Sequence, residues 1–353
     1  MKQQIQTLWP LAVTIVAFPY MGHADTQPTA NTIINCSGRP QVDNGANLFL
    51  TADWLLWQAN ETGLGFAVKT DTDSSITLGE GSVKSPAFTW TSGFRVGLGY
   101  NTPHDGWDLY LNWTWFQDKA SKSLHTDGDD FLYPAVIHPA NAVYALEAES
   151  KLHLHVNMLD LGMGREYEVS TWSTLKPFVG LRTAFVNQHN NIEYDNVYNV
   201  GINTLRYNDY EVERECNYWG LGIRTGLDTQ WELGRNFSLY ANAAVSLLYG
   251  FFHVEHEEEQ TLSSTGVHST NIDLVNSYRA ARAITDLQLG LRWDYLSPSS
   301  RYHLGIQAGW EQHLFFSQNQ FMDFVDDTAD GVFVQNQGDL ELQGWTIAMR
   351  FDF

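Results

Sequence analysis

Two short segments contain histidines at spacings that can bind a metal ion. His153 and His155 are two positions apart, so they share one face of an extended strand. The segment from His253 to Glu257 adds two histidines and two glutamates. Neither segment has a cysteine or a third histidine nearby at ligand spacing, and a structural zinc site needs four ligands. We therefore expect no metal site: His153 and His155 should face an aqueous lumen, and the second segment should be solvated, with weak divalent binding as its alternative.

The chain contains no residue pattern that indicates enzymatic chemistry. Outer-membrane hydrolases need a Ser/His or Asp/His pair at a barrel rim. Serine, histidine and aspartate are abundant in the polar segments, but no spacing singles out a pair. No glycine-rich phosphate loop follows a predicted strand. We predict that the protein is not an enzyme and uses no cofactor.

Charged residues recur at regular positions inside otherwise alternating segments. Five arginines lie on the polar faces of five different segments, and six acidic residues share those faces. The predicted pore-lining residues are Arg95, Arg182, Arg224, Arg292, Arg350, Asp53, Asp108, Asp228, Asp286, Asp294 and Glu311. An arginine that faced lipid at the bilayer centre would cost about 2 to 4 kcal/mol, so these faces must meet water or paired charges. Two interpretations remain: a polar lumen that is open to water, and a filled barrel that is held together by ion pairs.

Glycines on the same faces favour the open lumen, because glycine leaves space and has little preference for strands. They are Gly97, Gly99, Gly220, Gly222, Gly226, Gly290, Gly305 and Gly309. The segments between strands are rich in acidic residues, for example Glu255 to Glu259. Such charges at a channel mouth concentrate cations, so we predict a mild cation preference.

These residues need strands to position them, and the last eleven residues show the pattern most clearly. From Gln343 to Phe353, every second side chain is apolar on one face, while the other face carries Arg350 and Asp352. Ten segments of this kind occur, and many run for ten residues or more. About 9 to 11 residues cross a bilayer as a tilted strand, whereas soluble strands average about 5 to 6. A soluble edge strand is the alternative for the last segment taken alone.

The connections between these segments alternate in length. Short turns are predicted near residues 102, 170, 234 and 298, and long loops at 61–90, 120–148, 189–216, 254–281 and 315–340. Short periplasmic turns and long external loops are typical of outer-membrane barrels. We predict an all-β fold: a closed antiparallel transmembrane β-barrel with an even strand number, ten strong strands, and twelve or more as the alternative.

The N-terminus indicates export. Lys2, an apolar stretch from Leu8 to Phe18 and a small-x-small site ending at Ala24 predict a signal peptide over residues 1–24. Residues 25–46 are polar and predict a flexible periplasmic segment, and residues 47–353 form the barrel. Cys36 and Cys216 could form one disulfide in an oxidising compartment, or remain as separate thiols. The net charge of −21 excludes a nucleic-acid partner, because phosphate contacts need Lys and Arg.

Several short motifs occur in a fixed order along the mature chain. They are the run from Phe49 to Trp57, Leu159 to Arg165, Leu175 to Arg182, Trp219 to Leu227, Tyr249-Gly250, Gly309-Trp310-Glu311 and Leu342 to Phe353. Together they resemble the major-outer-membrane-protein-like pore-forming proteins of chlamydial and legionella-type bacteria. With only two cysteines, the chain departs from the cysteine-rich cross-linking of the chlamydial members.

The resemblance implies a bacterial outer-membrane porin that lets small hydrophilic solutes and ions diffuse through a polar lumen. The alternative is a structural or adhesive surface barrel without an open channel. The expected partners are outer-membrane lipid and lipopolysaccharide, the solutes themselves, and the barrel-insertion machinery, which reads a final strand ending in an aromatic residue such as Phe353. Formation of a homo-oligomer is left open.

Overall fold

The computed structural model describes residues 42, 45–70, 81–103, 106–126, 130–138, 143–199, 206–262, 265–325 and 332–353. The predicted signal peptide, most of the segment 25–46, and Cys36 lie outside these described residues. Among the described residues, no helix is both long enough and apolar enough to cross a membrane.

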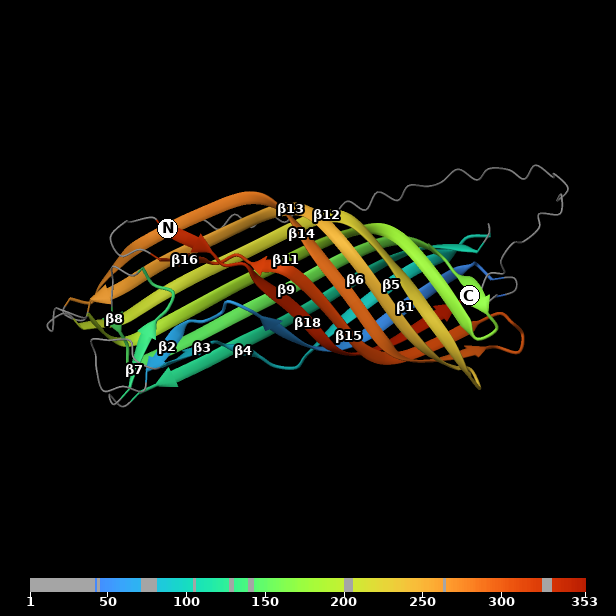
Figure 1. The fold of residues 1–353 in the computed structure, drawn as a ribbon, viewed down its shortest axis with the longest axis horizontal. Coiled ribbons are helices and arrows are strands. Elements are labelled where there is room, and N and C mark those ends of the chain that lie inside the picture. Colours follow the sequence, from blue (N-terminus) through green and yellow to red (C-terminus); the bar gives the residue numbers. More distant parts are fainter. Residues whose placement is uncertain are drawn as a thin grey trace. The chain divides into compact units, whose positions relative to one another are not determined.

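Ten long strands form a ring, because each is hydrogen-bonded antiparallel to two others (Figure 1). In ring order they are β1 (Leu48–Glu61), β5 (Thr91–Asn101), β6 (Trp107–His125), β9 (Glu147–Arg165), β11 (Ser173–Asn199), β12 (Arg206–Gly234), β13 (Phe237–Leu262), β14 (Val267–Leu296), β15 (His303–Asn319) and β18 (Gly338–Asp352). β18 then pairs with β1, and the backbone N–H of Phe353 donates to the carbonyl of Leu48 at 3.0 Å. The predicted all-β, antiparallel fold is confirmed.

Eight short strands accompany the ring in the part of the chain that the structure describes. β2 (Ala67–Thr70), β3 (Gly81–Lys84) and β7 (Phe131–Pro134) form a separate three-stranded sheet. β16 (Met322–Phe324) pairs with β17 (Phe333–Gln335). The other three are attached to ring strands: β4 (Ala87–Phe88) to β6, and β8 (Val143–Tyr144) and β10 (Tyr167–Ser170) to β11.

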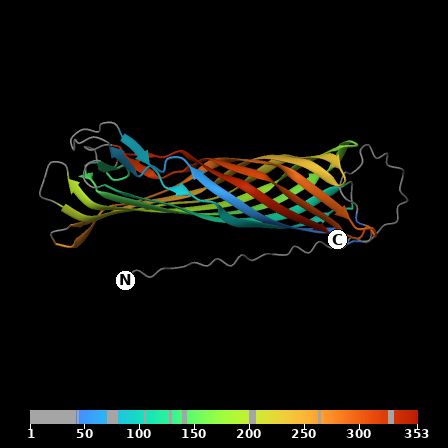
Figure 2. The ribbon, with the colours of Figure 1, turned by 90° about the horizontal axis from the view of Figure 1, so that it is seen from below.

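The two ends of the ring differ. At the end where the C-terminus lies, four short connections join β5 to β6, β10 to β11, β12 to β13 and β14 to β15 (Figure 2). We call this the turn end and the opposite end the loop end. At the β12–β13 turn, Arg235 and Asn236 have φ of 55° and 64°, as a two-residue type I′ hairpin requires. The four predicted turn positions are confirmed.

Two of the predicted long loops are wrong. Residues 189–216 and 254–281 are mostly strand, because β11 and β12 run on to Asn199 and Arg206, and β13 and β14 to Leu262 and Val267. In their described parts these stretches alternate as strands do, but most polar side chains lie on the outer face and most apolar ones on the inner face, with buried polar exceptions such as Asn190, Arg214 and Glu258. Because many glutamates lie on their outer faces, these stretches have an amino-acid composition that resembles that of loops.

β9 shows this reversal of the two faces within one strand. Toward the turn end, Leu161 and Met163 point outward and are exposed. Toward the loop end, Leu152 and Leu154 are fully buried inside the ring, and His153 points outward. An apolar face turns toward lipid where the surroundings are lipid and toward the interior where they are water. The reversal therefore marks where the lipid-facing part of the strand ends.

The outer surface of the turn half carries a continuous set of exposed apolar side chains, which we call the outer belt. Its members on seven of the strands include Leu50, Trp54, Leu98, Leu111, Trp113, Leu161, Leu181, Leu221, Ile223, Trp345 and Ile347. The interior of the loop half is the opposite. A core of buried apolar side chains fills it, and Trp57, Phe116, Tyr218, Phe252 and Phe315 are among its largest members.

Candidate functional site

A cavity of about 240 Å³ lies inside the ring, in the half nearer the turn end. Nine of the eleven predicted pore-lining residues line it: Asp53, Arg95, Arg182, Arg224, Asp228, Asp286, Arg292, Glu311 and Arg350. The other two, Asp108 and Asp294, lie beside it and pair with the lining residues Lys176 and Arg292. The structure thus brings the predicted residues together, while their role in conduction remains a prediction.

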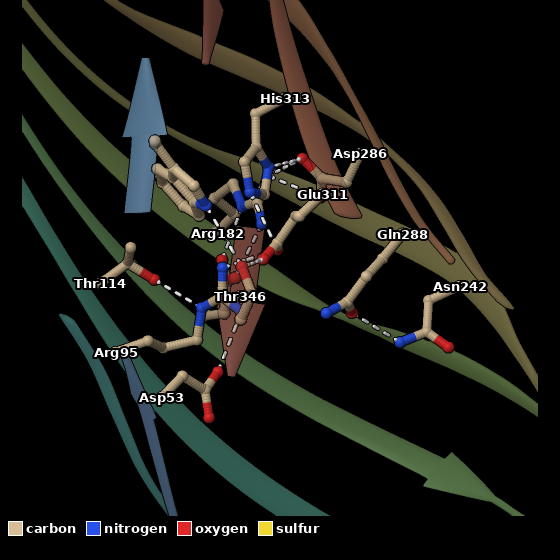
Figure 3. A network of polar contacts seen from close by, with 12 residues as sticks. Asp53, Arg95, Thr114, Arg182, Asn242, Asp286, Gln288, Glu311, His313 and Thr346 are labelled. Atoms are coloured by element: carbon tan, nitrogen blue, oxygen red, sulfur yellow. Dashed lines mark hydrogen bonds and ion pairs between the residues drawn. The ribbon is translucent and has the colours of Figure 1, made fainter. Parts of the chain in front are cut away.

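Arg95 connects three strands across the cavity (Figure 3). From β5, its guanidinium lies 3.1 Å from Asp53 on β1 and 2.7 Å from Glu311 on β15. Its Nε also donates to the Thr114 hydroxyl on β6 at 3.1 Å. All four side chains are largely buried, so each charge has its partner within the ring rather than in water.

Arg182 makes a second set of pairs on the other side of the cavity. It donates to both carboxylate oxygens of Asp160 on β9, at 2.6 and 2.8 Å, and lies 2.9 Å from Asp286 on β14. Arg224 on β12 also reaches Asp286, at 3.1 Å. Bidentate arginine–carboxylate pairs are the strong ones, because two parallel hydrogen bonds fix the geometry.

His313 links the two sets and was missed by the sequence analysis. Its Nδ1 lies 2.8 Å from Asp286, and its Nε2 lies 3.0 Å from Glu311 (Figure 3). Its position two residues after Glu311, on the same strand face, was the signal that could have found it. With a protonated imidazole, the network of Asp53, Arg95, Asp160, Arg182, Arg224, Asp286, Glu311 and His313 carries four charges of each sign.

Two polar groups in the cavity wall are not used by this network. Among the described residues, Asp228 has no ion pair or hydrogen bond, although it lines the cavity. The buried hydroxyl of Tyr240 likewise has no hydrogen-bond partner in the part of the chain that the structure describes. Of the two, Asp228 is available to water or to a solute, whereas the Tyr240 hydroxyl is packed against neighbouring strands.

The inner-face glycines do not leave an open lumen. The hydroxyl of Tyr240 lies 2.8 Å and 2.5 Å from where a Cβ would sit on Gly290 and Gly309. The ring of Phe49 covers Gly99 in the same way. Glycine on one strand therefore makes room for an aromatic ring from a neighbour, so the inference from glycine to empty space was wrong.

The cavity is closed toward the loop end. Trp57 packs on His313 at 4.9 Å and on Phe116 at 5.5 Å between ring centroids, and its Nε1 donates to Thr346. Beyond this layer, the segment from Gln318 to Met322 is buried within the loop half. The expected polar lumen thus holds only for the turn half in this conformation.

Residues 42–353 match the protein family described as "Legionella pneumophila major outer membrane protein precursor". The chain belongs to this family. The suspected resemblance is confirmed, and the outer belt is accordingly the surface that meets the lipid of the bacterial outer membrane.

Solved structures similar to this outer membrane protein include the translocator domain of autotransporter NalP from Neisseria meningitidis, with 12% identity, 88% of this chain and 90% of that chain covered, and a TM-score of 0.31. The P. putida toluene transporter TodX has 8% identity, with 87% of this chain and 90% of that chain covered, and a TM-score of 0.29. A Pseudomonas aeruginosa FadL homologue has 8% identity, with 87% of this chain and 89% of that chain covered, and a TM-score of 0.25. These scores are too low to carry an argument about mechanism. No curated protein matches the chain.

Both histidine segments of this outer membrane protein differ from expectation. His153 and His155 are not in the lumen, because they lie on the outer face of β9 above the outer belt. Burial and the nearby Lys119 and His189 lower the pKa of His153. In the second segment, His253 is solvated and contacts Glu255 at 2.8 Å, whereas His256 is buried. Among the described residues, no group of three or more His, Cys, Asp or Glu side chains is arranged to hold a metal ion.

Cys216 lies on the inner face of β12 in the loop half. It is fully buried, its Sγ is 3.9 Å from the carbonyl oxygen of Gln318, and burial raises its pKa to about 12. Because Cys36 lies outside the described residues, the predicted disulfide remains a prediction. Such a thiol would be inert in its buried position.

Glu61 is a buried acid of the loop half. Gln188 donates to its Oε1, its Oε2 has no hydrogen-bond partner among the described residues, and burial raises its pKa to about 7. The folded state therefore holds a proton that the unfolded state has released between about pH 4.5 and 7, so stability should fall as the pH rises through this window.

We expect Glu61→Gln to remove this pH dependence and to stabilise the protein at pH 8. Urea unfolding at pH 5 and pH 8 would measure it, with Glu149→Gln on the exposed outer face of β9 as control. Equal pH dependence in the wild type and Glu61→Gln would contradict the assignment.

Proposed function

We propose that this chain is an outer-membrane porin, a closed transmembrane β-barrel through which small hydrophilic solutes and ions diffuse passively. The turn end faces the periplasm and the loop end faces the exterior. The observation that carries the proposal is a charged cavity enclosed by strands whose outer faces are apolar. Ten strands in a hydrogen-bonded ring leave no unpaired edge at the level of the outer belt, as hydrocarbon requires.

The structure corresponds to a closed state in this proposal. Conduction requires that the Trp57 side chain and the segment from Gln318 to Met322 move aside. Both polar side-chain atoms of the buried Gln318 lack a hydrogen-bond partner among the described residues. An unpaired buried polar group costs about 1 to 3 kcal/mol, so hydration of this segment offsets part of the cost of opening.

Ion conductance of the refolded protein in a planar bilayer tests the proposal. We expect discrete current steps, with long closed periods because the loop half is filled. A membrane that contains the protein and stays without steps over the whole accessible voltage range would contradict it.

The alternative, a structural or adhesive surface barrel, is favoured by one observation. The filled loop half and the paired charges are what a barrel without a channel would need. The absence of current steps, together with partner binding that depends on the loop-end residues, would support this second function. In neither case do we propose enzymatic activity.

Ion selectivity should come from the loop end rather than from the cavity. The cavity wall is nearly balanced, with six arginine and lysine side chains, beside His313, against six acidic ones: Arg95, Lys176, Arg182, Arg224, Arg292 and Arg350, and Asp53, Asp160, Glu166, Asp228, Asp286 and Glu311. The outer faces of β12 and β13 near the loop end are strongly acidic. We expect a weak cation preference that is screened by salt. Reversal potentials in a potassium chloride gradient would show it, and anion preference would contradict it.

The proposal includes three kinds of partner. Outer-membrane lipid and lipopolysaccharide surround the outer belt and the region above it. The barrel-insertion machinery reads the final strand, whose last residue Phe353 is paired with β1. A homo-oligomer of further copies of the chain is the third partner.

A further inference from the structure

β14 has an unpaired edge near the loop end. Its partner β15 pairs with it only from Ile284 onward, whereas β13 pairs with it up to Val267. Among the described residues, no strand pairs with the other side of residues 267–283. Below Ile284 the ring is complete, so this edge begins where the lipid-facing part of the barrel ends.

The edge lacks two of the features that commonly prevent pairing with another chain, proline and lysine, although it carries Arg279 and Arg282. Exposed edges are commonly short, or carry proline or lysine. Residues 267–283 contain neither, and one irregularity interrupts the pairing, at Asn271. From Ile272 to Ala283 the strand is regular, which is about 40 Å of backbone at about 3.3 Å per residue.

The inner side of this edge is mostly apolar, with Asn276 and Arg282 as its polar members, and the Arg282 guanidinium lies over the Phe252 ring. Leu274, Tyr278 and Ala280 are partly buried and pack against the core of the loop half. Tyr278 stacks on Phe252 with ring centroids 5.4 Å apart, and its hydroxyl donates to Gln320 at 2.7 Å. A strand added beside β14 would place every second side chain next to this surface.

The outer side of the same sheet is acidic near the loop end, whereas Arg279 lies on the outer face of β14 farther from that end. On β12 and β13, glutamates lie directly opposite one another in three successive pairs: Glu211 with Glu259, Glu213 with Glu257, and Glu215 with Glu255. Asp273 on β14 lies opposite Glu257. Like charges directly opposite destabilise a sheet. Neighbours such as Asn191 and His253 offset part of this repulsion through contacts with Glu211 and Glu255. The outward side chains of an added strand would meet this negative field.

We propose that the edge of β14 binds an extended segment of another polypeptide, in which basic and apolar residues alternate. The segment adds a strand to the sheet, as in other cases of β-strand addition, where backbone hydrogen bonds supply affinity and alternate side chains supply specificity. Its apolar residues face Leu274 and Tyr278, and its basic residues face Asp273 and the glutamates of β13. A second copy of this chain fits less well, because it brings one acidic face against another. The approach of this partner from outside the cell rests on the orientation in the proposed function.

Binding of a synthetic peptide tests the proposal directly. The probe is a twelve-residue peptide of alternating lysine and valine, labelled for fluorescence anisotropy and mixed with the full chain refolded in micelles. Two further peptides carry backbone N-methyl groups, one on all lysines and one on all valines. Only alternate N–H groups of an added strand point at the edge, so one methylated peptide should lose binding and the other should keep it. Equal binding of the two methylated peptides, whether strong or weak, would overturn the proposal.

Charge reversal locates the surface. Asp273→Lys should weaken the peptide that binds by about fivefold or more at low salt, because it replaces an attraction with a repulsion. Glu149→Lys makes the same change on the outer face of β9, away from the edge, and should have little effect. An equal loss in both variants would indicate attraction to overall charge alone and would overturn the proposal. Conductance of the same samples reports on the pore separately, so failure of either proposal is distinguishable.

Discussion

Replacing Arg182 with alanine is expected to lower the free energy of unfolding by about 3 to 5 kcal/mol. Arg182 is almost completely buried and pairs with Asp160 and Asp286, so its removal leaves two buried carboxylates short of a partner. Breaking a buried pair costs more than the pair contributed, because the charge left behind is poorly solvated. Urea unfolding of the refolded protein in micelles measures the change.

Arg292→Ala is the matched control for this prediction. Arg292 also faces the interior and pairs with Asp294, but it lies nearer the turn end, and its side chain is 19% exposed. Its carboxylate partner keeps a second contact with His303 at 2.9 Å. We expect a loss below about 1 kcal/mol. Similar losses for both variants would mean that the Arg182 network is not the stabilising crosslink described above.

Trp57→Ala should increase the open probability of the channel by about tenfold or more, which corresponds to about 1.4 kcal/mol at 25 °C. Trp57 is fully buried and separates the charged cavity from the loop half. Its removal opens a void between His313 and Phe116, into which the polar cavity can extend. Single-channel recordings at fixed voltage measure the open fraction.

Trp54→Ala provides the control, because it removes the same side chain three residues earlier on the same strand. Trp54 points outward from the ring and is 49% exposed in the outer belt. It should leave the open probability unchanged. The same increase in both variants would assign the effect to weaker folding, and no increase with Trp57→Ala would contradict the placement of the closure.

Much of the fold was predictable because the turn half of each strand has a simple pattern. There, lipid outside and polar groups inside impose strict alternation, and the short turns at 102 and 234 carry glycine or asparagine. The loop half was misread, because water outside and an apolar core inside reverse the alternation. In β9, the apolar side chains from Leu152 to Met158 keep the period of two, but they face the interior of the ring instead of its outer surface. A period of two identifies two faces without saying which one is inside.

The site was predictable in its charges but not in its packing. Arg95 and Asp53 are on different strands, and only the shared polar face indicated that both point inward. Their contact depends on the register between β1 and β5, where Asp53 lies opposite Arg95. The filling of the glycine positions by Phe49 and Tyr240 depends on rings from neighbouring strands, and the closure by Trp57 depends on contacts across the ring. None of these is local in the sequence.

Chemical modification of a single cavity residue tests the central claim that the conducting path runs through the charged cavity. Asp228 is the suitable position, because it lines the cavity and has no ion pair or hydrogen bond among the described residues. The experiment uses Asp228→Cys in a background where Cys36 and Cys216 are replaced by serine, and adds a positively charged methanethiosulfonate reagent during recording. Loss of most of the single-channel current is the result predicted. An unchanged current with complete labelling would contradict the account.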